Sequence, residues 1–107
     1  MESELIKNLL SFYEEEPGDP FNSYALALEY KKIDQVKAIF FFNKLLKEFP
    51  DYLPTYYAAA EFFTAIESHD KVEKIYNDGI ALALGQKQLK THQELVRAKN
   101  MWLDEMD

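Results

Sequence analysis

The chain has 107 residues, of which 48% are hydrophobic and 15% aromatic, so it is long enough for one folded domain and unlike a disordered chain. Its formal net charge of −7 disfavours nucleic acid and anionic membranes as partners, because both attract basic surfaces. The absence of cysteine excludes disulfides, thiolate metal sites and cysteine nucleophiles.

Helices are expected throughout, because apolar residues recur at helical spacing between turn-forming clusters and no segment alternates with a period of two. The sequence therefore predicts an all-α fold. The expected helices are 2–15, 21–31, 35–48, 54–66, 70–83 and 87–105.

The first expected helix begins in MESELIKNLL, which lacks the basic start of a signal peptide. No stretch of the chain has the roughly 18 apolar residues of a membrane span, so a cytoplasmic location is expected. Along this helix one apolar stripe is predicted to face the core. Its residues are Leu5, Leu9, Phe12 and Tyr13.

The turns between the next expected helices contain residues that commonly cap helix ends. In PGDP, Asp19 is expected to cap a helix that has Pro20 in its first turn. Asp34 is expected to cap the following helix, and Asp70 the fifth, with the pattern of a capping box. The segment around Gly85 is expected to end that fifth helix.

Three consecutive phenylalanines occupy the third expected helix. They span roughly 200° around its axis, so one core-facing stripe does not accommodate all three. Phe42 falls within the stripe and Phe41 beside it, whereas Phe40 falls among polar residues with Val36 as its one apolar neighbour. Phe40 is therefore predicted to lie off the core-facing stripe, and it is either singly exposed or covered together with Val36 by a loop, a second copy or another partner.

An internal repeat spans the middle of the chain. Ala38 and Phe42 recur as Val72 and Tyr76, 34 residues later, and the preceding helices align with a spacing of 33. Small residues at such positions let two helices approach, and large residues fill the gaps between them. The first repeat has Ser23, Leu26, Ala27, Tyr30, Ala38, Phe42 and Pro50, and the second has Tyr56, Ala59, Ala60, Phe63, Val72 and Tyr76.

This period and pattern resemble the tetratricopeptide repeat family over about residues 19–85, and its small two-repeat bacterial proteins in particular. Three positions depart from the pattern: Ser23 replaces a large aromatic, Val72 a small residue and Leu84 the closing proline. The resemblance implies an α-α superhelix of about two helical hairpins with a capping helix at each end. The implied parts of this single domain are 1–17 for the N-terminal capping helix, 19–52 for repeat 1, 53–85 for repeat 2 and 86–107 for the C-terminal capping helix.

The second repeat and the last helix add two packing predictions. Gly79 lies alone inside a helix, where close approach of another helix accounts for it. The last helix is expected to pack through one apolar side. The residues of that side are Leu89, Val96, Trp102, Leu103 and Met106.

In tetratricopeptide repeat proteins the first helix of each repeat lines a concave groove where partner peptides lie. The resemblance therefore implies a non-catalytic scaffold or adaptor that binds a peptide or helical segment of another protein. The alternative to an open groove is that the long terminal helix covers it. The predicted partner-binding residues are Tyr24, Leu28 and Lys31 in the first repeat and Tyr57, Glu61 and Thr64 in the second.

Two other functions compete with this one. A structural protein that forms a homodimer would associate through Val36 and Phe40, or through Trp102 on the terminal helix. Enzymatic or metal chemistry is disfavoured, because His69 and His92 lack paired ligands and no glycine-rich phosphate loop is present. No cofactor is expected.

Overall fold

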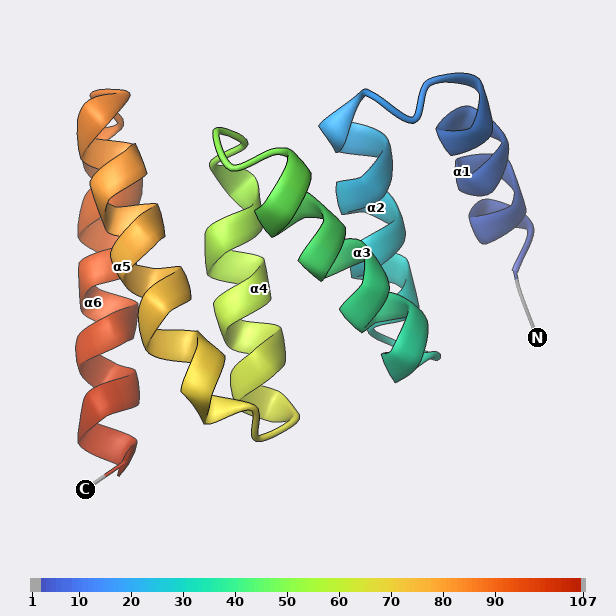
Figure 1. Ribbon diagram of the computed structural model, residues 1–107. Coiled ribbons are helices and arrows are strands. Elements are labelled where there is room, and N and C mark those ends of the chain that lie inside the picture. The colour runs from blue at the N-terminus through green and yellow to red at the C-terminus, as the bar shows by residue number, and fades with distance from the viewer. Residues whose placement is uncertain (1–2, 107) are drawn as a thin grey trace. The chain divides into compact units, whose positions relative to one another are not determined.

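The structure is a computed structural model that describes residues 3–106. Within that range the chain forms helices and no strand, which confirms the all-α prediction. The predicted start of the first helix at residue 2, and the outermost residues of the predicted capping helices, lie outside the described residues. The helices labelled in Figure 1 are α1 (Glu4–Glu15), α2 (Pro20–Tyr30), α3 (Gln35–Glu48), α4 (Pro54–Ala65), α5 (His69–Gly85) and α6 (Leu89–Met106).

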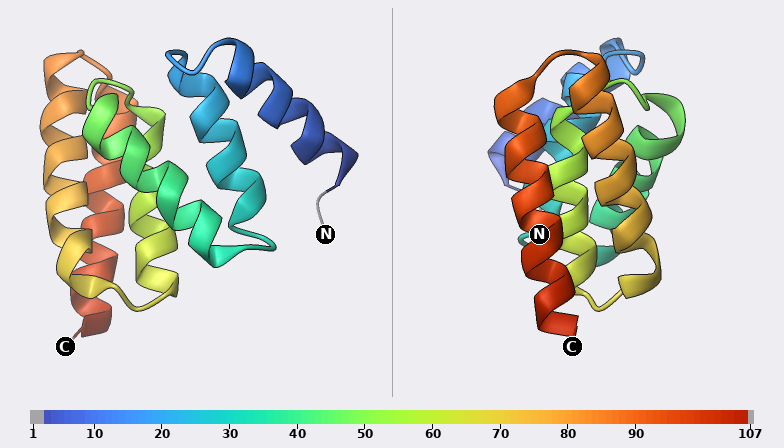
Figure 2. Two further views of the ribbon diagram at one scale, coloured as in Figure 1. Left: turned by 45° about the vertical axis from the view of Figure 1, so that its right-hand side comes forward. Right: turned by 90° about the vertical axis from the view of Figure 1, so that its left-hand side faces the viewer.

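The chain divides into two compact units, Met1–Thr55 and Tyr56–Asp107. Unit 1 holds α1, α2 and α3, and unit 2 holds α5, α6 and all but the first two residues of α4. In unit 1, α2 packs against both α1 and α3, and in unit 2, α5 packs against α6. Figure 2 shows α5 and α6 side by side and antiparallel. None of the helices described is long and apolar enough to cross a membrane.

Carboxylate side chains cap the N-terminal ends of α2 and α3, as predicted. The side chain of Asp19 accepts a hydrogen bond of 3.0 Å from the N–H of Phe21, and Pro20 lies in the first turn. The side chain of Asp34 accepts one of 3.1 Å from the N–H of Lys37. Each bond satisfies a backbone donor that the helix leaves unpaired, so local chemistry fixes where these two helices start.

Both ends of α5 differ in detail from the prediction. The helix begins one residue before Asp70, so Asp70 lies in its first turn, and Ser68 takes the cap position without a side-chain hydrogen bond. The expected Asp70 cap is wrong because Glu67, with a φ of 62°, reverses the chain tightly after α4. At the other end α5 finishes at Gly85, but the left-handed residue is Lys87, with a φ of 59°.

Phe41 is the centre of the aromatic contacts in unit 1. Its ring centroid lies 5.4 Å from that of Tyr13, edge to face, and 5.9 Å from that of Tyr30, stacked. Phe42 is fully buried, whereas Phe40 is 58% exposed. The prediction that Phe40 is the member of the three that lies off the core-facing stripe is confirmed, and among the described residues it is exposed.

Helix α1 packs through a face different from the predicted one. Ile6 is buried and Tyr13 contacts Phe41, but Leu5 and Phe12 are 51% and 56% exposed. The prediction of Leu5 and Phe12 as core residues is therefore wrong. Because α1 carries apolar residues on two neighbouring faces, its packing partner decides which face is buried.

In unit 2, Gly79 marks the closest approach between helices. A Cβ atom added there would lie 2.6 Å from the Cβ of Tyr56 on α4 and 3.3 Å from Cδ1 of Leu95 on α6. Contacts below about 3.0 Å are too close for real Cβ atoms, so only glycine fits without movement of its neighbours. The predicted role of Gly79 in close packing is confirmed.

Helix α6 packs through a face that matches the predicted one only in part, since the predicted Trp102 is buried and the predicted Val96 is half-buried. Leu95 and Trp102, two turns apart, are buried, whereas Leu89 is 62% exposed and Met106 51%. Leu103 is 37% exposed. The expectation that Leu89, Leu103 and Met106 form the packing side is wrong, because α6 is rotated to place Leu95 against α5.

Candidate partner-binding site

A pocket of about 220 Å³ lies in unit 2, where α4, α5 and α6 meet. Its α4 side chains are one helical turn apart, as are those of α6, so each helix presents one face to it. The lining residues are Tyr57, Glu61 and Thr64 from α4, Tyr76 from α5, and Ala98, Met101, Trp102 and Glu105 from α6.

Two of the aromatic side chains that line the pocket are buried. Tyr76 is 6% exposed and Trp102 is 8% exposed, and their ring centroids lie 6.2 Å apart. Burial raises the pKa of the Tyr76 hydroxyl, and the nearby Tyr57, Glu61 and Glu105 raise it further. The Nε1–H of Trp102 is buried and has no hydrogen-bond partner among the residues described.

The rim of the pocket is open to solvent. Tyr57 is 45% exposed and Met101 58%, and Glu61 and Glu105 are also exposed. The hydroxyl of Thr64 donates a 2.8 Å hydrogen bond to the carbonyl of its own helix four residues earlier. The rim therefore offers carboxylates and an aromatic ring, and the terminal helix lines this pocket without closing it.

The structure brings three of the predicted partner-binding residues, Tyr57, Glu61 and Thr64, into this one pocket. Sequence reasoning missed the contribution of Tyr76, which was assigned only a packing role, and of the α6 residues. The spacing of Ala98, Met101, Trp102 and Glu105 was available as a signal, because it places all of them on one helical face.

The other three predicted residues lie on or at the end of α2 in unit 1. Tyr24 and Leu28 are half-buried, and Lys31 is exposed at the C-terminal cap of the helix. The ring of Tyr24 packs edge to face against Tyr52 at a centroid distance of 5.7 Å. The Tyr24 ring is therefore held in place by the connection that follows α3.

Tyrosines that are buried or half-buried make the stability of the protein sensitive to alkaline pH. Burial raises the pKa values of Tyr24, Tyr52 and Tyr76 above the ordinary value of 10.0. In the unfolded chain these hydroxyls ionise near pH 10, while the folded state still holds their protons, so stability is lost as pH rises above about 10. We expect the melting temperature to fall between about pH 9.5 and 11, as followed by circular dichroism.

The variant Tyr24→Phe/Tyr52→Phe tests this cause, because it removes two of the three groups. Its melting temperature should fall less steeply over the same pH interval. A pH dependence as steep as that of the unsubstituted protein would contradict the assignment.

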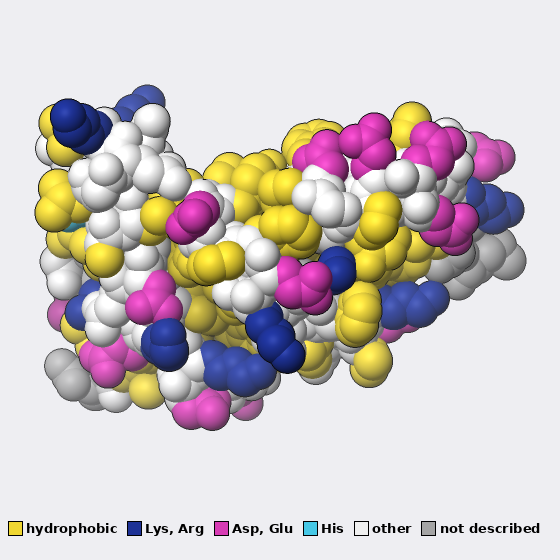
Figure 3. Space-filling view, turned by 45° about the horizontal axis from the view of Figure 1, so that its top comes forward, with side chains coloured by type: hydrophobic (Ala, Val, Ile, Leu, Met, Phe, Trp, Pro, Cys, Tyr) yellow, Lys and Arg dark blue, Asp and Glu magenta, His cyan; other side chains and the backbone are white. Residues whose placement is uncertain are grey.

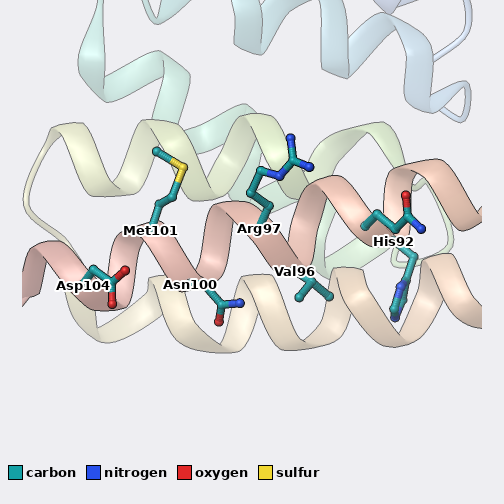
Figure 4. Close-up of a pocket in the computed structure, with 7 residues that line it drawn as sticks. His92, Val96, Arg97, Asn100, Met101 and Asp104 are labelled. Carbon is teal, nitrogen blue, oxygen red and sulfur yellow. The ribbon is translucent and has the colours of Figure 1, made fainter.

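A second hollow, of about 420 Å³, runs along the outer face of α6. Figure 4 shows its residues in two rows, with His92, Val96 and Asn100 along one edge of the helix and Arg97 and Met101 along the other. All its lining residues belong to this single helix, so the hollow is a shallow surface without walls from a second element.

The residues proposed for self-association differ in accessibility. Val36 is 76% exposed and Phe40 58%, one turn apart on α3, whereas Trp102 is buried against Tyr76. Trp102 therefore presents no free surface to a second copy. Figure 3 shows hydrophobic side chains at the surface, interleaved with acidic and basic ones. Among the described residues, no group of three His, Asp or Glu side chains is placed to hold a metal ion.

A solved structure is similar to most of this chain. No protein-family model and no curated protein sequence matches the chain. The solution NMR structure of a tetratricopeptide repeat domain protein from Salinibacter ruber superposes with a TM-score of 0.74 and is 35% identical in sequence. The match covers 79% of this chain and 87% of that one.

Proposed function

Because this chain belongs to the tetratricopeptide repeat family, we propose that it is a non-catalytic interaction module that binds a segment of another protein. The family fold is a scaffold for protein–protein interaction in general. The observation that supports a particular site is the pocket of unit 2, where an aromatic floor meets an open rim at three groove positions of the second repeat.

We propose that Tyr57 is the main anchor of the partner segment. Tyrosine offers a large contact area with little loss of side-chain freedom, and aromatic residues carry a large share of the binding energy in interfaces. Tyr57 lines the pocket and is still 45% exposed. In unit 1, Tyr24, Leu28 and Lys31 are proposed as further contacts with the same partner.

The substitution Tyr57→Ala tests this proposal. Peptides selected from a random phage-displayed library on the unsubstituted protein should bind Tyr57→Ala at least about tenfold more weakly, as measured by isothermal titration calorimetry. Leu84→Ala is the matched control, because Leu84 is 57% exposed on α5 and lies outside the pocket. Equal loss of binding in both variants, or in neither, would argue against the site.

Self-association is a second candidate function, favoured by the exposure of Val36 and Phe40 on α3. A homodimer through this pair would bury both side chains against the second copy. Light-scattering mass should then rise with concentration over about a hundredfold range, and Phe40→Lys should return the protein to a monomer. A dimer whose mass is unchanged by Phe40→Lys would exclude this surface.

A further inference from the structure

We propose that two copies of this chain associate through the outer face of α6, with the two helices antiparallel around a two-fold axis beside Val96. The inference goes beyond the proposed function, and it concerns a surface other than Val36 and Phe40 of α3. It follows from three rows of side chains along α6, none of which lines the pocket where α4, α5 and α6 meet. Each row matches its own reverse.

The outer face of α6 points away from the helices of its own unit. The inner face is buried through Leu95 and Trp102, and Nζ of Lys99 donates a 2.6 Å hydrogen bond to Asn77 of α5. The hollow of about 420 Å³ lies on the outer face, and the seven residues that line it all belong to α6 (Figure 4). A second copy of the helix would supply the wall that this hollow lacks.

The first row is apolar and has intervals of seven residues. Leu89 is 62% exposed, Val96 is half-buried and Leu103 is 37% exposed. Residues seven apart lie within about 20° of one another around a helix, so the three share one side. Because the row is symmetric about Val96, a reversed copy would place Leu103 against Leu89 at both ends. Terminal helices of repeat proteins normally have a polar outer face, so an apolar row there suits a covered surface.

The second row consists of two amides beside the apolar row. Gln93 and Asn100 are both exposed, and they lie three residues before and four residues after Val96. In the antiparallel pair each would therefore face the other on the second copy. An amide side chain both donates and accepts hydrogen bonds, so Gln93 and Asn100 can pair in both directions. This row can be covered without burial of a charge or of an unpaired polar group.

The charges of the third row decide the direction of the second helix. Lys90, Arg97 and Asp104 are exposed and again seven residues apart. In a parallel pair each would meet its own copy, which gives three contacts of like charge. In the antiparallel pair Lys90 meets Asp104 of the second copy at both ends, and only Arg97 meets its own copy. Neither the Lys90 nor the Asp104 side chain has a hydrogen bond or ion pair with another residue in the described range.

The net charge of −7 restricts where two copies can meet, because molecules of like charge repel. In the three rows of α6, Asp104 is the one carboxylate and two residues are basic. The other outer helix is less suitable. Leu5 and Phe12 of α1 are 51% and 56% exposed, but α1 carries three glutamates and one lysine. A second copy of this acidic chain therefore fits α6 better than α1.

The length of the rows sets the expected strength of the dimer. Residues 89–104 cover about 22 Å of helix. Contact along one helix of this length is smaller than the roughly 800 Å² per partner of a standard interface. We therefore expect a weak dimer, with a dissociation constant on the order of 0.1 mM.

Sedimentation equilibrium of the full chain from about 10 µM to about 1 mM tests the inference. The mass of the unsubstituted protein should rise from 12.6 kDa toward twice that value. Lys90→Glu should weaken dimerisation by about tenfold, because both contacts between Lys90 and Asp104 become contacts of like charge. The double variant Lys90→Glu/Asp104→Lys restores opposite charges only in the antiparallel pair, so its dissociation constant should return to within about threefold of the original.

Lys7→Glu is the matched control, because it makes the same change of charge at an exposed position of α1. Arg97→Gln removes the one contact of like charge and should strengthen the dimer by about threefold. A chain that stays monomeric to about 1 mM, or an equal effect of Lys90→Glu and Lys7→Glu, would overturn the inference.

Two further results would also overturn the inference. One is a double variant that dimerises as weakly as Lys90→Glu alone. The other is a dimer that Phe40→Lys abolishes and that none of the α6 substitutions changes, since its contact would lie on α3. Either result leaves the proposed function standing, because the substituted α6 residues lie outside the pocket that contains Tyr57.

Discussion

Replacing Phe42 with alanine is expected to lower the free energy of unfolding by about 3–5 kcal/mol. The side chain is fully buried, so its removal leaves a cavity that its neighbours fill only in part. Phe41→Ala should have an effect of similar size, because Phe41 is 6% exposed and contacts the rings of Tyr13 and Tyr30. Urea denaturation followed by circular dichroism measures both losses.

Phe40→Ala provides the internal control in the same three-residue run. Because Phe40 is 58% exposed, its replacement should change the free energy of unfolding by no more than about 1 kcal/mol. The slope of free energy against urea concentration should be the same in all variants, so that the midpoints alone report stability. Three equal losses would contradict the orientation of α3 described above.

Gly79→Ala is expected to destabilise the protein by about 2 kcal/mol, although alanine is the better helix former. The added methyl group would lie 2.6 Å from the Cβ of Tyr56, close to the backbone, so α4 and α5 must move apart. That overpacking exceeds the roughly 1 kcal/mol that alanine gains in helix propensity. Thermal and urea denaturation both report the loss.

Gly85→Ala is the comparison that isolates the steric effect. Gly85 also lies in α5, its φ is not positive, and nothing lies within 4 Å of an added Cβ. This variant should therefore be unchanged or more stable by up to about 1 kcal/mol. A stabilised Gly79→Ala variant would show that α4 and α5 do not approach as closely as described.

The helices and most of their ends could be predicted from the sequence, because local chemistry determines them. Asp19 and Asp34 cap helices through bonds to residues two and three positions away, and such bonds need no tertiary partner. Glu67 is different. A glutamate in a left-handed conformation has no local signature, so the early start of α5 was missed.

The faces of the two outer helices could not be read from the sequence. In α1 the exposed Leu5 is adjacent to the buried Ile6, and in α6 the half-buried Val96 is adjacent to the buried Leu95. Apolar residues on two neighbouring faces leave the direction of packing undecided until a partner helix is placed.

Only part of the candidate site could be predicted from the sequence, for a related reason. Its α4 residues share one face of a single helix, and the family resemblance pointed to that face. The contributions of Tyr76 and Trp102 require the rotation of α5 and α6 about their axes, which Gly79 and Leu95 set through tertiary contacts.

The packing of each helix on its neighbour in the chain has a kinetic consequence. α2 contacts α1 and α3, and α5 contacts α6, so many contacts join residues close in sequence. Chains with such low contact order fold within microseconds to milliseconds, because little loop-closure entropy is lost before contacts form. Repeat proteins of this kind also open one segment at a time, so backbone amides in different hairpins should exchange their hydrogens for deuterium at different rates.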